Sequence, residues 1–325
     1  MKTALKVWLI IAVSLVVVGG ALFCIVMAAN GWDFSRLGSR KMVTNTYKIT
    51  EDFDSVSIRT DIEDISFLPS SDGSCSVVCE EEEKAPHTVG VQDGTLMIGV
   101  EDRRAWYDYI GNFTVNFKKP SITVYLPETG YESLAIEEDT GDITIPKDFS
   151  FENVEITTST GNVNTSASSS GLLRIKTSTG NISVSDLSAG TLELSVSTGH
   201  VTVRNVVCGG DADLTVSTGK AEFTDLSCGS LRSTGSTGDF SLKNVTAEGG
   251  MNIKRSTGDV SFDRCDASEL EIKTDTGKVT GSLLSPKVFI TRSDTGKIDV
   301  PETTEGGKCK ITTDTGRIQI EIDGE

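Results

Sequence analysis

The chain has 325 residues, of which 37% are apolar, 6% are aromatic and 32 are glycine, a composition that suits a thin, turn-rich core better than a thick one. Its formal net charge is −17, and because residues 1–30 contain two lysines and no acid, the remainder carries −19. This charge disfavours nucleic acid and anionic lipid as partners of the body of the chain, and leaves cationic peptides, sugars and other proteins.

The first residues predict a membrane anchor. The stretch Val7-Ala29 contains no charge, and as a helix at about 1.5 Å per residue it spans the ~30 Å core of a bilayer. We therefore expect an anchor at 1–29 with its transmembrane part at 7–29. A cleaved signal peptide is the alternative, although its apolar region is usually only about 7 to 15 residues long. The basic tail of Lys2 and Lys6 favours an N-terminus inside and a body outside the cytoplasm.

The next hundred residues read as short strands. After a polar linker at 30–42, the range 43–136 contains apolar and polar residues in alternation, as in FDSVSIRT, SCSVVCE and PSITVYLP. Clusters of Gly, Pro, Ser and Asp separate these segments, as they do between strands. We expect this region to be a β region that caps the repeats that follow it.

A repeated tripeptide, Thr-Gly preceded by Ser or Asp, organises the rest of the chain. Its spacing is always 19 or 20 residues, the signature of a stack of repeated units. The ten copies have their glycines at Gly141, Gly161, Gly180, Gly199, Gly219, Gly238, Gly258, Gly277, Gly296 and Gly316.

Aligning the copies on this glycine gives columns of apolar residues. Val163, Ile182 and Val201, for example, each stand two positions after a glycine, and further apolar columns lie at spacings of two, which indicates strands with one buried face. Because the columns recur in every unit, each face is buried against neighbouring units. The sequence therefore predicts an all-β fold in which residues 137–325 form a β-solenoid of about ten coils.

The tripeptide itself is best explained as a turn. Glycine supplies positive φ at the third position of a type II-like turn, and the residue after it is expected to face water. One coil cannot fold alone, since about five buried side chains at ~1.5–3 kcal/mol each do not offset ordering some 19 residues at ~1–2 kcal/mol each. Stability must come from stacking, so the ten glycines are predicted to be structural.

Tandem [ST]-x-[SD]-T-G-[ND]-[IV] units that follow alternating strands ending in ITVYLP, behind one N-terminal anchor, resemble the bacterial toast-rack putative adhesin family. The resemblance extends from about residue 45 to the end. It implies β-strand repeats of unknown function and an envelope-associated role, either adhesin-like or in sensing envelope stress. It implies no catalytic residues.

Three motifs suggest chemistry that their context does not support. Asp-Thr-Gly is the tripeptide of aspartic proteases, but here Ser-Thr-Gly copies occupy the same slot. The LPETG at 126–130 matches a sortase signal, yet some 195 residues follow it. Asp275, Asp294 and Asp314 would stack at a spacing that suits Ca²⁺, but Lys or Arg follows each glycine and offsets the charge. We expect no catalytic residue, cofactor or metal.

Cysteine and histidine give no further site. The seven cysteines lack metal-like spacing. Cys208 and Cys228 each fall nine residues after a repeat glycine, so a disulfide between them fits the repeat, although buried free thiols are favoured. His87 and His200 are far apart and are expected at the surface.

The end of the chain predicts an exposed strand edge. We expect Glu321, Asp323 and Glu325 to protect the last strand from edge-to-edge association.

We interpret the chain as a non-enzymatic, membrane-anchored and extracytoplasmic β-solenoid that works as a binding or stress-sensing surface. Its partners would be the membrane, through Val7-Ala29, and an envelope protein, peptide or glycan. One alternative is a polysaccharide-acting enzyme on a parallel β-helix, which requires paired carboxylates where long insertions break the repeat. The other is a passive structural spacer.

Overall fold

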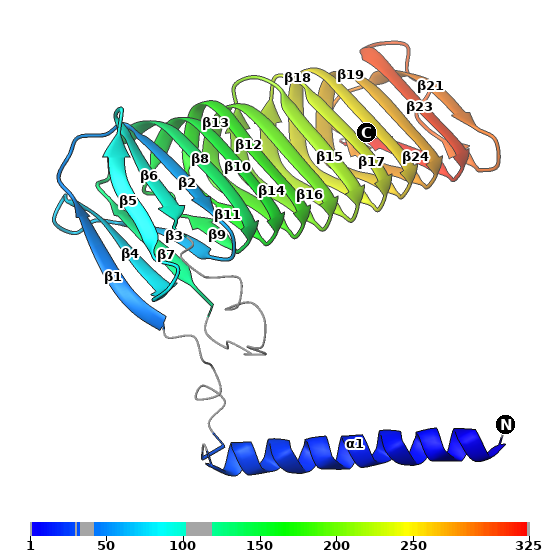
Figure 1. The fold of residues 1–325 in the computed structure, drawn as a ribbon. Helices are drawn as coiled ribbons and strands as arrows, with labels where there is room; N and C mark the ends of the chain where they lie inside the picture. The colour runs from blue at the N-terminus through cyan, green and yellow to red at the C-terminus, as the bar shows by residue number, and fades with distance from the viewer. Residues whose placement is uncertain (1, 30, 33–41, 102–118, 324–325) are drawn as a thin grey trace.

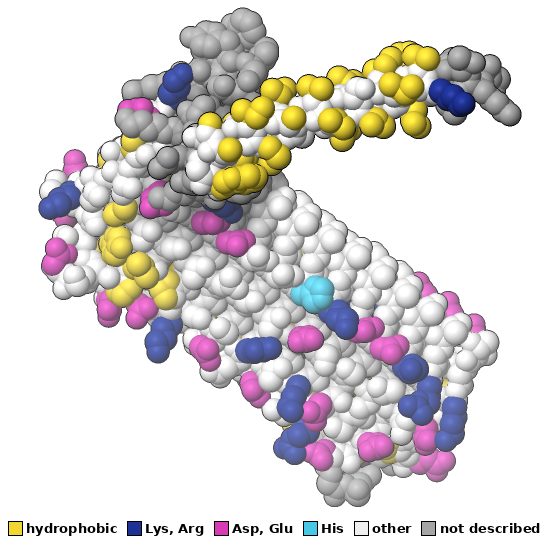
Figure 2. Space-filling model, turned by 90° about the horizontal axis from the view of Figure 1, so that it is seen from below, with side chains coloured by type: hydrophobic (Ala, Val, Ile, Leu, Met, Phe, Trp, Pro, Cys, Tyr) yellow, Lys and Arg dark blue, Asp and Glu magenta, His cyan; other side chains and the backbone are white. Residues whose placement is uncertain are grey.

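The computed structural model describes residues 2–29, 31–32, 42–101 and 119–323. It contains one helix, α1 (Lys2–Ala29), and 24 strands that are hydrogen-bonded into one continuous sheet. The segment Lys6–Ala29 has a mean hydropathy of 3.0 and is long and apolar enough to cross a membrane. Hydrophobic side chains cover α1, whereas acids and bases alternate over the visible face of the solenoid (Figure 2).

The strands wind into the predicted β-solenoid of about ten coils (Figure 1). The N-terminal strands are β1 (Met42–Ile49), β2 (Ser55–Thr60), β3 (Asp64–Pro69), β4 (Cys75–Glu82), β5 (His87–Gln92), β6 (Thr95–Val100), β7 (Ser121–Leu126), β8 (Gly130–Thr140) and β9 (Ile143–Ile145). The middle strands are β10 (Ser150–Thr160), β11 (Val163–Thr165), β12 (Ser168–Thr179), β13 (Ile182–Thr198), β14 (Val201–Cys208), β15 (Ala212–Thr218), β16 (Ala221–Cys228), β17 (Leu231–Thr237), β18 (Phe240–Thr257), β19 (Val260–Thr276) and β20 (Val279–Leu283). The last strands are β21 (Lys287–Ser293), β22 (Ile298–Asp299), β23 (Gly307–Thr315) and β24 (Ile318–Ile322).

Neighbouring coils pair in parallel with the register that the repeat predicts. Leu173 of β12 lies opposite Leu192 of β13, and Ile182 lies opposite Val201 of β14. These four residues are at most 1% exposed, because every second side chain points into the coil and stacks on its counterpart in the next coil. The hydrophobic core is consequently one continuous column that runs the length of the solenoid.

The stack begins before the first Thr-Gly copy. Strands β2 and β3 pair in parallel with β8 and β9, and β6 and β7 extend the same two sheets on the far side. Antiparallel strands complete this end, with β5 against β6, β4 against β7 and β1 against β4. A coil without the tripeptide therefore lies within the range 43–136.

The repeat glycines stack directly on one another. A Cβ atom built on Gly219 would lie 1.7 Å from the carbonyl oxygen of Gly199, and one on Gly199 would lie 1.8 Å from that of Gly180. The φ of Gly219 is 141° and that of Gly238 is 126°, far from the value of about 80° in a type II turn. Glycine is required both by this backbone conformation and by the absence of space for any side chain between coils.

The last two repeats are stacked in the reverse of their sequence order. Strand β23 pairs with β19 on one side and with β21 on the other, and β24 lies between β20 and β22. The outermost coil is therefore formed by β21 and β22. The expected terminal edge is shorter than predicted, because β24 pairs with β20 along its whole length but with β22 only at Ile318 and Gln319, which leaves residues 320–322 with a strand partner on one side. Asp323 contacts Arg264 at 2.8 Å. Glu325 lies outside the described residues.

One buried cation interrupts the apolar core. Arg255 is 4% exposed, and its guanidinium lies 5.0 Å from the centre of the Phe240 ring. It donates a hydrogen bond of 2.9 Å to Ser233 Oγ, while its Nε has no partner. Gly235 provides the room, since a Cβ there would lie 1.6 Å from Arg255 Nη1. Burial lowers the pKa of Arg255 to about 10, so the core holds a charge that lacks full compensation.

Candidate functional site

A corner of the solenoid is set by a second column that sequence reasoning missed. The sixth residue after the repeat glycine has a φ between 51° and 57° in five successive coils, at Asp186, Asn205, Asp225, Asn244 and Arg264. Asn and Asp tolerate this left-handed conformation better than other non-glycine residues. Their side chains also link coils in pairs, with Asn205 Nδ2 donating to Asp186 Oδ1 and Asn244 Nδ2 donating to Asp225 Oδ1, both at 2.8 Å.

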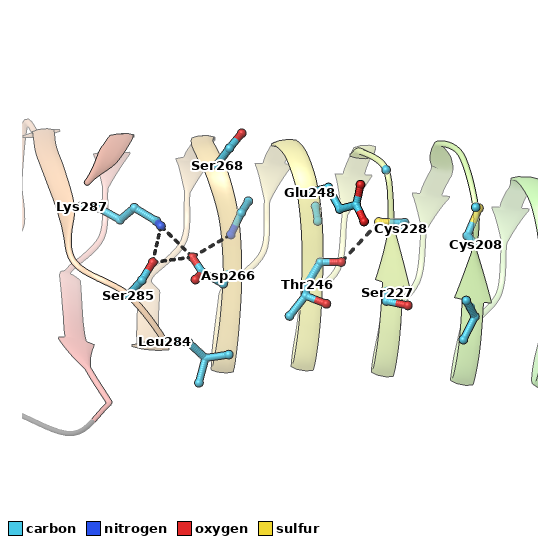
Figure 3. Close-up of a pocket in the computed structure, with 15 residues that line it drawn as sticks. Cys208, Ser227, Cys228, Thr246, Glu248, Asp266, Ser268, Leu284, Ser285 and Lys287 are labelled. Carbon is cyan, nitrogen blue, oxygen red and sulfur yellow. Dashed lines mark hydrogen bonds and ion pairs between the residues drawn. The ribbon is translucent and has the colours of Figure 1, made fainter. Parts of the chain in front are cut away.

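A groove of about 610 Å³ runs along the solenoid just after this corner (Figure 3). Five successive segments of the chain line it, at 207–209, 227–229, 246–248, 266–268 and 284–287. Ser227 and Thr246 are exposed along it, whereas the residues that follow them, Cys228 and Ala247, point inward and are buried. The inward residues are small, so hydroxyl groups and backbone form the wall together with the apolar side chains of Val207 and Leu284. Such a surface offers hydrogen-bond donors and acceptors at the spacing of the coils.

An ion pair closes the C-terminal end of the groove (Figure 3). Lys287 Nζ lies 2.7 Å from Asp266 Oδ1 and donates to Ser285 Oγ at 2.6 Å, and Ser285 Oγ donates to the same carboxylate at 3.0 Å. The side chain of Lys287 is only 5% exposed. Burial alone would raise the pKa of Asp266, but the hydrogen bonds from Lys287 and Ser285 lower it below its usual value. The carboxylate is thus held ionised.

The cysteines beside the groove are free thiols. Each of the seven cysteines is free, and Cys208 and Cys228, in neighbouring coils, are both buried. Burial raises the pKa of Cys228 to about 12, so its thiol is protonated and unreactive at neutral pH. Both side chains act as small apolar residues, the role that the sequence favoured over a disulfide.

The predicted turn column contributes a ladder of hydrogen bonds and no pocket. The residue after the glycine is exposed or half-buried, and its side chain accepts from the backbone of the next coil: Asn162 N donates to Asp142 Oδ1 at 2.8 Å, and Asn181 N donates to Asn162 Oδ1 at 3.0 Å. This ladder was not apparent from the sequence, although the Asn and Asp residues at this position are its signal. It explains why the column is polar without requiring a ligand.

The three stacked aspartates stand in the spatial order Asp275, Asp314, Asp294, because the last two repeats are exchanged. Lys273 lies 3.5 Å from Asp275, and Arg292 lies 3.1 Å from Asp294. The charges of Asp275 and Asp294 are therefore offset by the basic residues two positions earlier in the sequence, whereas Thr312 stands at that position before Asp314.

His200 is exposed as expected, but the expectation for His87 is wrong. His87 is 4% exposed and contacts two carboxylates, Glu81 and Glu63. Burial alone would lower the pKa of His87, but the neighbouring Cys79 side chain and Glu63 carboxylate raise it to about 10. Sequence reasoning missed this group because the turn between β4 and β5 and a separate coil bring its members together.

These features define an all-β solenoid with one apolar N-terminal helix, a long polar groove on one corner and a buried polar cluster at one end. The family model for Toastrack DUF4097 matches residues 53–227 and 209–325, and the chain belongs to this family.

Solved structures of similar fold come from bacteria. A "putative lipid binding protein" of Parabacteroides distasonis is 16% identical, covers 87% of this chain and 98% of its own, and has a TM-score of 0.48. A "putative adhesin" of Parabacteroides merdae is 14% identical with the same coverage and a TM-score of 0.47. A "putative adhesin" of Bacteroides fragilis is 16% identical, again with this coverage, and has a TM-score of 0.33. No match was found among curated proteins.

Proposed function

We propose that the protein is held in a membrane by α1, with its N-terminus inside, and that the solenoid stands outside the cytoplasm as an adhesin-like or stress-sensing surface. On this proposal the corner groove holds an extended partner, either a peptide or a glycan of the cell envelope. The groove is the observation that carries the proposal, because it crosses five successive chain segments and exposes Ser227, Thr246 and Ser268.

The dimensions and chemistry of the groove suit an extended ligand. Coils follow one another at about 4.8 Å, so five segments offer a track of roughly 20 Å, the length of about six extended peptide residues at ~3.3 Å each. Hydroxyl and backbone groups along the track can pair with peptide amides or sugar hydroxyls. The exposed apolar side chains of Val207 (57%) and Leu284 (38%) add contact area at its two ends.

The groove gives no support to the enzyme alternative. A glycosidase requires one carboxylic acid that keeps its proton and one carboxylate that is ionised. The groove contains Glu248 and Asp266, but the Asp266 carboxylate is already engaged by the Lys287 ammonium and the Ser285 hydroxyl, so it is not free to act on a substrate. Incubation of the protein with a panel of envelope glycans tests this alternative, and we expect no release of reducing ends.

The binding proposal is tested by photo-crosslinking in living cells. A photoreactive tyrosine analogue placed at Ser227, in the centre of the groove, is expected to give discrete adducts with one partner. The matched control is the same photoreactive analogue at Ser241, which is also exposed on the solenoid but does not line the corner groove. Equal adduct patterns at the two positions, or none at either, would leave the spacer alternative as the better account.

A blocking variant supplies an independent measurement. Ser227→Tyr should abolish the adducts formed from a probe at Thr246, because the added ring occupies the groove, while Ser241→Tyr should leave them unchanged. Both positions are exposed, so neither change should affect folding.

The membrane arrangement needs a separate test. Protease added to intact protoplasts should remove the solenoid and leave a fragment that contains α1. If the solenoid is protected until the membrane is opened, the proposed orientation is wrong. If the purified protein begins after residue 29, α1 is a cleaved signal.

A further inference from the structure

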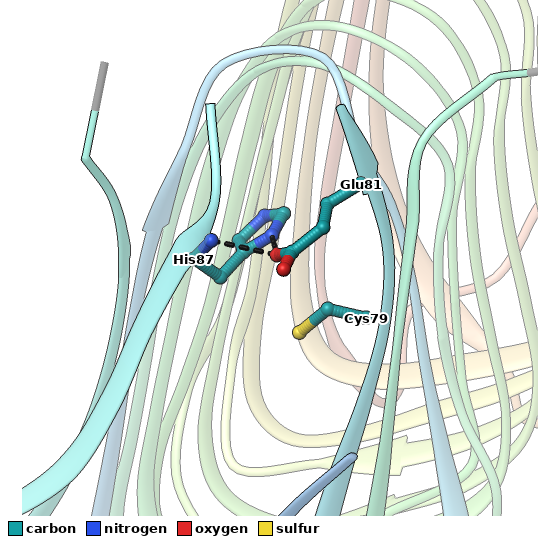
Figure 4. Close-up of side chains that lie close together, drawn as sticks. All are labelled: Cys79, Glu81 and His87. Atoms are coloured by element: carbon teal, nitrogen blue, oxygen red, sulfur yellow. Dashed lines mark hydrogen bonds and ion pairs between the residues drawn. The ribbon is translucent and has the colours of Figure 1, made fainter. Parts of the chain in front are cut away.

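A buried group of metal-ligating side chains lies at the N-terminal end of the solenoid (Figures 1 and 4), whereas the corner groove runs over later coils, from Val207 to Lys287. Cys79 and Glu81 lie two residues apart on β4, so both point to the same, inner side of the strand. His87 is the first residue of β5, after a connection of four residues. Cys79 and Glu81 have no exposed surface, and His87 is 4% exposed.

The ligand atoms of these three residues converge. The Cys79 sulfur, a Glu81 carboxylate oxygen and a His87 ring nitrogen all lie within 4.8 Å of one another. His87 Nδ1 is 2.5 Å from Glu81 Oε2 (Figure 4). Thiolate, imidazole and carboxylate are the donors that Zn²⁺ takes, at about 2.3, 2.0–2.1 and 2.0–2.2 Å. Two such ligands of one tetrahedral ion lie about 3.3–3.8 Å apart, so a shift of roughly 1 Å converts the cluster to a coordination sphere.

The residues around the cluster orient its three side chains, as the hydrogen-bond partners of metal ligands do in known sites. The second ring nitrogen of His87, Nε2, has no hydrogen-bond partner and lies 3.6 Å from Glu63 Oε1. Glu63 Oε2 is occupied by the backbone N–H groups of Asp61 and Ile62, at 3.0 and 2.8 Å, so Oε1 is the oxygen left for the imidazole. Once an ion holds Nδ1, Nε2 carries the proton and donates it toward Glu63.

Glu81 is oriented from the opposite side. Its Oε1 accepts from the amide of Asn45 and, at 3.3 Å, from the hydroxyl of Tyr47, both on β1. The backbone N–H of His87 donates to its Oε2 at 2.6 Å. Strands β1, β4 and β5 and the turn before β3 all meet at this point, so an ion here would hold the antiparallel strands onto the first coil.

We propose that Cys79, Glu81 and His87 form a structural site for a divalent transition-metal ion of the zinc type, with Glu63 orienting the imidazole. The ion replaces the proton between His87 and Glu81 and the thiol proton of Cys79, and both protons pass to solvent. No bond is oxidised or reduced. The fourth position is taken by water, since Glu63 faces the other ring nitrogen of His87.

The first test uses the full-length protein in detergent, stripped with chelator and loaded with Co²⁺ alone. We expect one ion per chain by elemental analysis and a thiolate-to-cobalt charge-transfer band in the near ultraviolet. Cys79→Ser should remove the band. Cys75→Ser is the matched control, since Cys75 is buried on the same side of the same strand and lies outside the cluster. A band that persists in Cys79→Ser, or is absent from the wild type, overturns the proposal.

A second measurement uses the wild type only and so does not depend on the folding of Cys79→Ser. Alkylation of Cys79 during partial denaturation, followed by mass spectrometry, should be slowed at least tenfold by a small excess of Zn²⁺. Alkylation of Cys228, a buried thiol of the middle coils, should be unaffected in the same sample. Equal protection of both cysteines, or of neither, means that the cluster is an ion pair and no metal site.

Discussion

The glycine column gives the sharpest test of how the coils are held together. In Gly219→Ala the new Cβ would lie 1.7 Å from the carbonyl oxygen of Gly199, where contacts below 3.0 Å do not occur, and the φ of 141° is strained for any side chain. The backbone conformation costs about 1–3 kcal/mol, and overpacking a filled site adds about 1–3 kcal/mol. The free energy of unfolding should therefore fall by about 2–6 kcal/mol.

The control for this change lies ten residues away along the chain. A Cβ on Gly209 has a single neighbour within 4 Å, the carbonyl oxygen of Ala189 at 4.0 Å, and its φ is not in the left-handed region. Gly209→Ala should change the stability by less than about 1 kcal/mol, or increase it. Ser217→Asp should also be close to neutral, because Asp occupies this position in other copies.

The assay combines urea unfolding, followed by far-ultraviolet circular dichroism, with hydrogen exchange. Gly219→Ala must separate two coils, so the amide hydrogen bonds that flank it, Gly219 N to Thr237 O at 2.9 Å and Gly199 N to Thr218 O at 3.0 Å, should exchange faster than in the wild type. The reasoning is refuted if Gly219→Ala and Gly209→Ala unfold at the same urea concentration with the same exchange pattern.

Three further outcomes are expected. Arg255→Met should leave the free energy of unfolding unchanged or raise it by about 1–4 kcal/mol, since it removes a poorly compensated buried charge. A lower free energy of unfolding, measured by chemical denaturation, would show that the guanidinium stabilises the core. The lowered pKa of Asp266 stabilises the fold above its ordinary value of 3.8, and this contribution is lost as the pH falls through the lowered value, so Asp266→Asn should weaken the dependence of stability on pH in acid titrations. Finally, a carbodiimide should join Glu271 to Lys310, which are 2.9 Å apart. Mass spectrometry should detect this link in preference to a link between Glu271 and residues 287–299, the repeat that sequence order would place beside it.

The repeat predicted the coils because its signal is local and regular. The spacing of 19 or 20 residues and the apolar columns determine which side chains point inward, and the parallel register follows from both, as with Leu173 opposite Leu192. The full reason for the glycines could not be predicted from a single copy of the repeat, because it is the direct contact between turns stacked in neighbouring coils. The Asn and Asp residues of the corner column stand at a constant position in the sequence. Their left-handed backbone and the groove next to it are seen only in the structure.

The candidate sites could not be predicted in the same way. The groove depends on small residues such as Cys228 and Ala247, whose spacing resembles that of any other inward position. The buried cluster depends on contacts between strands that share no period: His87 meets Glu81 across the turn between β4 and β5, and Glu63 across a coil boundary. In an irregular region, sequence separation says little about distance in space.

The exchange of the last two repeats shows how burial, and not sequence order, sets the end of the stack. Both repeats have the length and register to pair with β19. The repeat placed inside has buried inward residues, Cys309, Ile311 and Thr313 at 0% exposure, whereas the corresponding residues 289, 291 and 293 of the other are Phe, Thr and Ser and are half-buried. Placing the more apolar repeat between two neighbours removes more apolar surface from water. The less apolar repeat then covers the end of the column as an atypical terminal unit, which is the role that capping repeats have in other solenoids.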